Sequence, residues 1–162
     1  MTRYPLTDKK NLANKACQYA LLLSLAALGN TAAQAAIKTG TEAHPTPIHF
    51  TKGHVSTAIE GTLPAKATDY WYQFSAAKGQ YTVINISAKA GVSELANVGV
   101  LQFPSGAQDG TKGGIIYQGC LPETGTYKLR MARNLMATHG GKAGYHTEVV
   151  ILPPSASSEL CD

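Results

Sequence analysis

The sequence predicts an all-β protein, a single antiparallel β-sandwich of seven or eight short strands with a jelly-roll-like arrangement. Beyond residue 47 the chain consists of short runs in which apolar and polar side chains alternate, which is the period of a half-buried strand. Gly, Pro, Asn and Asp separate these runs at intervals of about ten residues. No stretch with the periodicity of an amphipathic helix lies between them, which favours a sandwich over an α/β fold.

Seven runs carry the strand pattern most clearly. The run at 80–88 is largely apolar on both faces, as expected for a central strand. In the run at 127–132, Tyr127, Leu129 and Met131 alternate with basic residues, so these three side chains are expected in the core. The full set is 54–63, 69–76, 80–88, 97–103, 114–121, 127–132 and 145–152.

Residues 1–35 have the features of a cleavable signal peptide. Four basic residues precede or flank the start of an apolar run at 19–28, which is too short for a membrane span because a span needs about 20 residues. An A-x-A cleavage site ends at Ala35, so the mature chain is expected to begin at Ala36. A retained N-terminal anchor is the alternative. The signal predicts a periplasmic or secreted protein, and no later segment is apolar enough to cross a membrane.

The rest of the chain is expected to form one domain. We predict a flexible lead-in at 36–47, the β-sandwich at 48–152 and a C-terminal tail at 153–162, which begins with two prolines. The roughly 127 residues after the leader suffice for a single hydrophobic core.

The net charge gives no reason to expect nucleic acid as a partner. The whole chain carries +4, but the leader contains four of the basic residues and one acid, which leaves +1 on the remainder. A near-neutral domain has no general attraction for nucleic acid or anionic membranes. Nucleic-acid binding is excluded on this count.

Two cysteines remain after the leader is removed. Cys17 lies in the leader, whereas Cys120 and Cys161 belong to the mature chain. Two thiols in an oxidising compartment are expected to form a disulfide, which here ties the tail to the domain. Two free thiols are the alternative.

No catalytic or metal-binding constellation is apparent, so we expect a binding protein that uses no cofactor rather than an enzyme. His44, His49 and His54 recur every five residues, but in a strand this spacing sends successive side chains to opposite faces. Zinc needs three or four converging ligands, so no metal site is predicted. A nucleophile elbow, paired carboxylates and a phosphate-binding Gly-rich loop are equally unsupported.

The last predicted hairpin has a long connection at residues 133–142. Hairpins usually turn in two to five residues, so a connection of this length is either functional or merely loose. It combines the basic donors Arg133, His139 and Lys142 with the apolar step Leu135-Met136. Such a loop can insert into a groove and donate charge-assisted hydrogen bonds to carboxylates there. A solvated loop whose Leu and Met cap the core explains the same residues, and the residue types leave both interpretations open.

Three segments together form a recognisable pattern. They are residues 49–54 with Ser56, Ala58 and Gly61; residues 70–74 followed by 77–80; and residues 121–130 followed by Arg133, Asn134 and Tyr145. This pattern, which spans roughly residues 48–152, resembles the periplasmic inhibitors of g-type lysozyme. The Leu-Pro-x-x-Gly-x-Tyr-x-Leu-Arg piece is similar to pre-peptidase C-terminal β-sandwich modules as well. The Phe-x-x-Gly opening and the Arg-Asn before a long loop favour the inhibitors.

The resemblance implies a β-sandwich that occludes the saccharide cleft of a lysozyme, most directly one of g-type. Family members present basic side chains from the last hairpin loop, helped by the turn between the second and third strands. Carried onto this sequence, Arg133 and Asn134 match the family pattern, whereas Thr138-His139 stands in place of its later basic pair. We therefore expect the partner-binding residues to be Arg133, Asn134, His139 and Lys142, with Lys66 as an auxiliary contact.

A cell-envelope or glycan-binding module without inhibitory activity is the alternative function. Trp71 and Tyr117 are the aromatic candidates for stacking on the sugar rings of peptidoglycan or another glycan. Against this function, we favour the interpretation in which Trp71 fills the second face of its strand as a buried residue.

Overall fold

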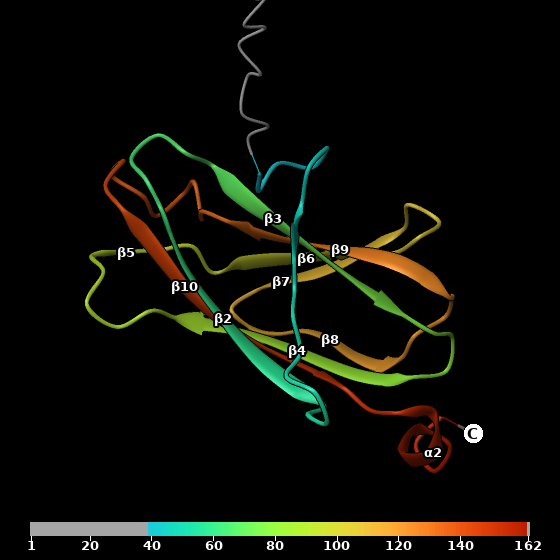
Figure 1. Cartoon of the computed structure of the whole chain (residues 1–162). Coiled ribbons are helices and arrows are strands. Elements are labelled where there is room, and N and C mark those ends of the chain that lie inside the picture. Colours follow the sequence, from blue (N-terminus) through green and yellow to red (C-terminus); the bar gives the residue numbers. More distant parts are fainter. Residues whose placement is uncertain (1–38, 162) are drawn as a thin grey trace, which may run out of the picture. The chain divides into compact units, whose positions relative to one another are not determined.

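The computed structural model describes residues 39–161, which form two facing β-sheets of five strands each (Figure 1). The predicted β-sandwich is therefore confirmed. The predicted signal peptide, residues 1–35, lies outside the described residues. Within residues 39–161, no helix has the length and hydropathy of a membrane span.

Eight of the strands have five residues or more, and these pair antiparallel. The first sheet contains, in spatial order, β1 (Thr46–Pro47), β3 (Asp69–Ala76), β9 (Gly125–Ala132), β6 (Val98–Gln102) and β7 (Gln108–Lys112). The second contains β2 (Ser56–Leu63), β10 (Ala143–Ile151), β4 (Tyr81–Ala88) and β8 (Gly114–Cys120), with β5 (Glu94–Leu95) beside β10. The two-residue strands β1 and β5 differ from the prediction, because they pair in parallel with β3 and β10.

The core lies between the two sheets and is built from their inward faces. Tyr127, Leu129 and Met131 of β9 are fully buried, as the alternation in the sequence predicts. Ile84 and Ile86 of β4 cover them from the second sheet and are also buried. Burying each aliphatic side chain contributes about 1.5–3 kcal/mol, so this shared interior is what holds the sheets together.

A pair of tyrosine hydroxyls links the sheets inside the core. The Oη atoms of Tyr72 on β3 and Tyr145 on β10 lie 2.6 Å apart, and burial raises the pKa of both hydroxyls. Gly61 pairs with Tyr145 across β2 and β10, and a Cβ at Gly61 would meet the Tyr145 hydroxyl at 2.1 Å. The missing side chain at Gly61 therefore leaves the space that the Tyr145 ring occupies.

Two segments depart from the predicted boundaries. β7 lies in a stretch predicted as a loop, because its residues are polar and it takes strand form only through pairing with β6. Within the segment predicted as a flexible lead-in, Gly40 and residues 46–47 bond to β3, and the strand β1 was not predicted. The carbonyl of Gly40 accepts the N–H of Trp71 at 3.0 Å, and β1 follows it.

The C-terminal tail is tied to the second sheet. A single helical turn, α2 (Pro154–Ser157), follows β10. The hydroxyl of buried Ser157 accepts the N–H of Tyr81 at 2.9 Å. Cys120 at the end of β8 forms a disulfide with Cys161, which decides between the predicted bridge and two free thiols in favour of the bridge.

Candidate partner-binding site

Three connections meet at one end of the sandwich, at the left in Figure 1. They are the β2–β3 turn (residues 64–68), the segment that contains β5 (residues 89–97) and the β9–β10 loop (residues 133–142). Hydrogen bonds join the base of the loop to each of the other two segments. The loop predicted to be functional is therefore supported from both sides.

Arg133 joins these three segments. It follows β9 directly, and its side chain is only 3% exposed. The guanidinium donates through Nη2 to the carbonyls of Leu63 (3.2 Å) and Pro64 (2.6 Å), and through Nε to that of Ala67 (2.5 Å). Nη1 forms an ion pair with Glu94 of β5 at 2.9 Å. Arg133, which the sequence predicts to contact a partner, thus forms its hydrogen bonds and its ion pair within the protein.

Glu94 holds the loop through a single carboxylate. It accepts the backbone N–H groups of His139 (3.1 Å) and Gly141 (2.7 Å), the hydroxyl of Thr138, and the ion pair from Arg133. The hydrogen bond from Thr138 contributes most to lowering the pKa of this carboxyl, followed by that from Gly141. The bond from His139 and the charge of Arg133 act in the same direction, and burial opposes them. The ionised form of Glu94 is therefore the form that fixes the loop.

Glu94 is absent from the set predicted by sequence, although one signal points to a residue of its kind. It lies 39 positions before Arg133, so no local motif connects the two. However, the alternation of Tyr127, Leu129 and Met131, continued by two positions, places Arg133 on the core-facing side. A buried guanidinium requires an acidic partner, which the sequence therefore implies without identifying it.

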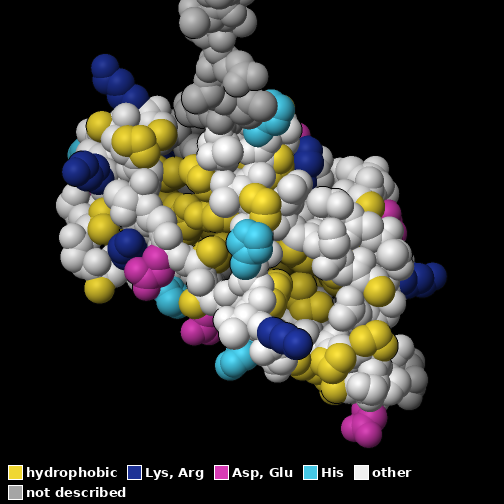
Figure 2. All heavy atoms as spheres, in the orientation of Figure 1, with side chains coloured by type: hydrophobic (Ala, Val, Ile, Leu, Met, Phe, Trp, Pro, Cys, Tyr) yellow, Lys and Arg dark blue, Asp and Glu magenta, His cyan; other side chains and the backbone are white. Residues whose placement is uncertain are grey.

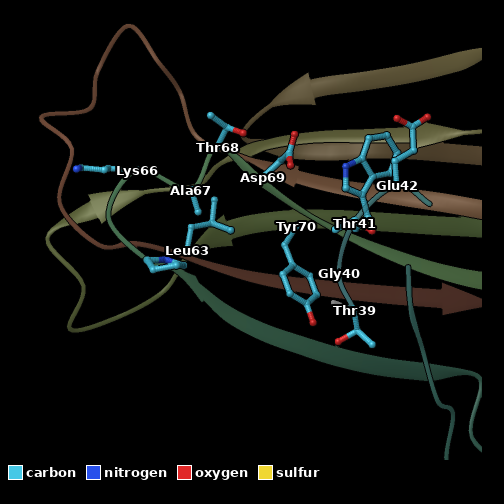
Figure 3. A pocket seen from close by; sticks show the side chains of 12 residues that line it. Thr39, Gly40, Thr41, Glu42, Leu63, Lys66, Ala67, Thr68, Asp69 and Tyr70 are labelled. Carbon is cyan, nitrogen blue, oxygen red and sulfur yellow. The ribbon is translucent and has the colours of Figure 1, made fainter. Parts of the chain in front are cut away.

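Lys66 occupies a strained position in the turn that Arg133 supports. Its φ of 70° lies in the left-handed region, where no other non-glycine among residues 39–161 is found. The N–H of Ala67 donates to the carbonyl of Pro64 at 3.1 Å and closes the turn. This backbone conformation costs an L-residue about 1–2 kcal/mol, which the hydrogen bonds from Arg133 help to offset. The ammonium group points away from the other residues around it (Figure 3).

Two exposed lysines lie near Pro64: Lys66 within the β2–β3 turn and Lys142 at the end of the β9–β10 loop. Lys142 lines one hollow with Pro64, and Lys66 lines another with Pro64 and Tyr70 (Figure 3). Both lysines and His139 are exposed, and neither lysine takes part in an ion pair within residues 39–161. Figure 2 shows Lys or Arg side chains projecting from this end of the molecule, with hydrophobic side chains among them. This end therefore offers free positive charge to a partner.

The tip of the β9–β10 loop is a tight turn at residues 134–137. Asn134 Oδ1 accepts the N–H of Met136 at 3.2 Å, and the Asn134 carbonyl accepts the N–H of Ala137 at 2.9 Å. Asn134, which the sequence predicts as a contact, therefore also shapes the turn. Leu135 is 68% exposed and Met136 is 93% exposed, so these side chains do not cap the core.

The aromatic candidates for glycan stacking are at least partly covered. Trp71 is buried, and the Cζ of Arg130 lies over its ring, 5.8 Å from the ring centroid. Tyr117 is half-buried and packs edge-on against Phe103, with 5.7 Å between ring centroids. Trp71, which is 8% exposed, therefore offers little surface for stacking on a sugar.

The histidines do not gather into a metal site. His44, His49 and His54 are all exposed. Within the described part of the chain, no three His, Cys, Asp or Glu side chains are placed to hold a metal ion together.

Two solved structures resemble this arrangement of strands. One is PliG of Aeromonas hydrophila, a periplasmic lysozyme inhibitor of g-type lysozyme, with a TM-score of 0.53 and 22% identity over 71% of this chain and 98% of that one. The other is PliG of Salmonella Typhimurium, described in the same words, with a TM-score of 0.51 and 21% identity over 66% of this chain and 96% of that one. The chain shares the fold of these inhibitors. No protein-family model and no curated protein matches its sequence.

The resemblance found in the sequence is thus confirmed at the level of the fold. The match extends over nearly the full length of both inhibitors, so the sandwich as a whole, and not a single hairpin, is what they have in common.

Proposed function

We propose that this chain is a proteinaceous inhibitor of g-type lysozyme that occludes the enzyme's saccharide cleft with the β9–β10 loop. The shared fold with two inhibitors of that enzyme supports the proposal. The observation that carries it is the bracing of the loop by the buried pair of Arg133 and Glu94. A loop already held in one shape binds a cleft without the entropic cost of ordering a flexible segment.

In this proposal the exposed basic side chains contact the enzyme. Lysozymes cleave glycosidic bonds with carboxyl groups in the cleft. Lys66, His139 and Lys142 donate charge-assisted hydrogen bonds to such carboxylates, which are stronger than bonds between neutral groups. Asn134 and Arg133 serve the same site by holding the loop in shape. The chain acts by binding and blocks catalysis without performing any.

We also propose that the protein acts in the periplasm or after secretion. The predicted signal peptide ending near Ala35 supports export. The disulfide between Cys120 and Cys161 fits an oxidising compartment. The two inhibitors that share the fold are described as periplasmic.

The experiment is a lysis assay on a peptidoglycan suspension. Lysozymes of g-type, c-type and i-type are each tested with and without the purified protein. We expect suppression of the g-type enzyme at near-stoichiometric ratios and little effect on the other two. Undiminished lysis by the g-type enzyme at excess protein contradicts the proposal.

A pull-down on purified peptidoglycan separates inhibition from glycan binding. An inhibitor that acts on the enzyme is not retained by peptidoglycan in the absence of lysozyme. Retention without lysozyme, together with undiminished lysis, would instead support a glycan-binding module.

A further inference from the structure

We infer that Leu135 and Met136 anchor this complex by entering an apolar subsite within an acidic cleft of the partner. The inference rests on the proposed function and concerns the chemistry of the same loop. It assigns most of the affinity to two side chains that the basic-loop interpretation leaves out, and it gives the cations a surrounding role.

Exposure singles out this pair. Six large hydrophobic side chains are exposed among residues 39–161: Val55, Leu95, Ile115, Leu135, Met136 and Leu160. Isolated exposed apolar residues are normal on protein surfaces. Leu135 and Met136 differ because they are adjacent in sequence and occupy the tip of a loop. Together they form one apolar projection, unlike the other exposed apolar side chains, which stand alone.

The tip is held in shape before any partner arrives. The side chain and carbonyl of Asn134 fix the turn, as described above. Thr138, immediately after the tip, donates to Glu94 and accepts the N–H of Gly140 at 3.3 Å. Because the backbone on both sides of the pair is fixed, an apolar contact made there loses little to conformational entropy.

The surrounding charge indicates the chemistry of the partner. Lys66 and Lys142 lie around the base of the loop and form no ion pair within the described residues, whereas Glu94 is already satisfied by its own loop. The matching surface is a pocket with an apolar floor and carboxylates at its rim. Apolar contacts at the centre of an interface govern affinity, and charges at its rim mainly govern the association rate.

The test compares the double variant Leu135→Ser/Met136→Ser with the control Leu160→Ser. Leu160 is 53% exposed and lies in the C-terminal tail, at the other end of the molecule in Figure 1. We expect the double variant to weaken inhibition of g-type lysozyme by about 30-fold or more, mainly through faster dissociation. Leu160→Ser should inhibit as the wild-type protein does.

Methionine oxidation gives a second measurement on the unmutated chain. Dilute hydrogen peroxide transfers one oxygen atom to a thioether and leaves water, and the resulting sulfoxide is polar. Met136 is 93% exposed, whereas Met131 is fully buried, so Met136 should be oxidised first. Peptide mapping by mass spectrometry identifies the site. Oxidation at Met136 should weaken inhibition, and methionine sulfoxide reductase should restore it.

The outcomes separate this inference from the proposed function. If the wild-type protein inhibits but the double variant and the Met136 sulfoxide inhibit equally well, the apolar anchor is wrong and the basic-loop inhibitor stands. If the wild-type protein inhibits no lysozyme, both are overturned. Circular dichroism and thermal unfolding of the double variant establish that its fold is intact.

Discussion

Glu94 and Arg133 form an ion pair that is almost fully removed from water, with 2.9 Å between Oε2 and Nη1 and side chains 10% and 3% exposed. The two residues lie 39 positions apart, so the pair connects β5 to the β9–β10 loop. A buried pair adds little net stability, but losing one partner leaves an unpaired charge in a poorly solvated place. The pair therefore determines the shape of the loop more than it stabilises the sandwich.

The first prediction concerns Arg133→Met. The substitution removes every side-chain bond between the loop and the β2–β3 turn and leaves Glu94 without its ion-pair partner. We expect the free energy of unfolding to fall, because Glu94 is left without its cation, and inhibition to weaken because the loop loses its shape. Denaturant unfolding measures the first effect. Hydrogen exchange of the His139 and Gly141 N–H groups, which bond to Glu94, measures the loss of loop shape.

Arg130→Met is the matched control for this prediction. Arg130 pairs with Asp69, but its side chain is 37% exposed and lies outside the loop. We expect Arg130→Met to leave unchanged both the hydrogen exchange of the loop amides and the inhibition of lysozyme. If Arg133→Met weakens inhibition while the loop amides keep their protection, then Arg133 contacts the enzyme directly and its positioning role is wrong.

The second prediction is a loss of loop order in acid. The pKa of Glu94 is held below its usual value of 4.5 in the folded protein. A carboxyl with a depressed folded pKa contributes stability above its unfolded pKa, and this contribution is lost as the pH falls through the folded value. We expect the loop amides to exchange faster, relative to the rest of the sandwich, as the pH falls below 4.5. Glu94→Gln should exchange fast throughout and show little of this dependence.

Glu60→Gln is the control for the acid response. The pKa of Glu60 is also lowered, chiefly by its hydrogen bond from His146 and then by Lys89, but Glu60 is exposed on β2 and does not contact the loop. Its substitution should leave the pH dependence of the loop amides as in the wild-type protein. An unchanged acid response in Glu94→Gln would show that another group controls the loop.

The fold was largely predictable because its determinants are local. Alternation along each run marks the core faces, and Tyr127, Leu129 and Met131 are buried as expected. β7 was not predictable, because its polar residues have no inward apolar face and its strand form depends on the neighbouring β6. The two-residue strand β1 was not predictable for a similar reason, since its strand form depends on pairing with β3 and not on its own composition.

The site was predictable in position but not in the roles of its residues. The length and composition of residues 133–142 single out the loop. Which side chains face inward depends on contacts between distant segments, above all between Arg133 and Glu94. Sequence reasoning assigned Arg133 to a partner because the chain resembles inhibitors that present basic side chains from their last hairpin loop. The exposed pair at the tip was visible in the sequence, but its exposure was not.

The third prediction compares Lys66→Gly with Lys66→Ala. Both remove the exposed charge, so both should weaken inhibition and reduce its dependence on salt. They should differ in stability, because glycine adopts the left-handed φ of 70° without strain and alanine does not. We expect the free energy of unfolding of Lys66→Gly to be about 1 kcal/mol higher than that of Lys66→Ala. Lys78 is an exposed lysine in the β3–β4 turn, so Lys78→Ala is the charge control and this variant should inhibit normally.

The fourth prediction separates stability from inhibition. Replacing Cys120 and Cys161 with serine removes a crosslink between residues 41 positions apart. In the loop-entropy account, such a crosslink stabilises the folded state by about 4 kcal/mol, so unfolding should occur at a clearly lower denaturant concentration. The bridge joins the end of β8 to the segment after α2, and Figure 1 shows both at the opposite end of the molecule from the β9–β10 loop. The inhibition constant measured well below the unfolding temperature should therefore be unchanged. A weaker inhibitor with a native circular dichroism spectrum would mean that the tail itself takes part in binding.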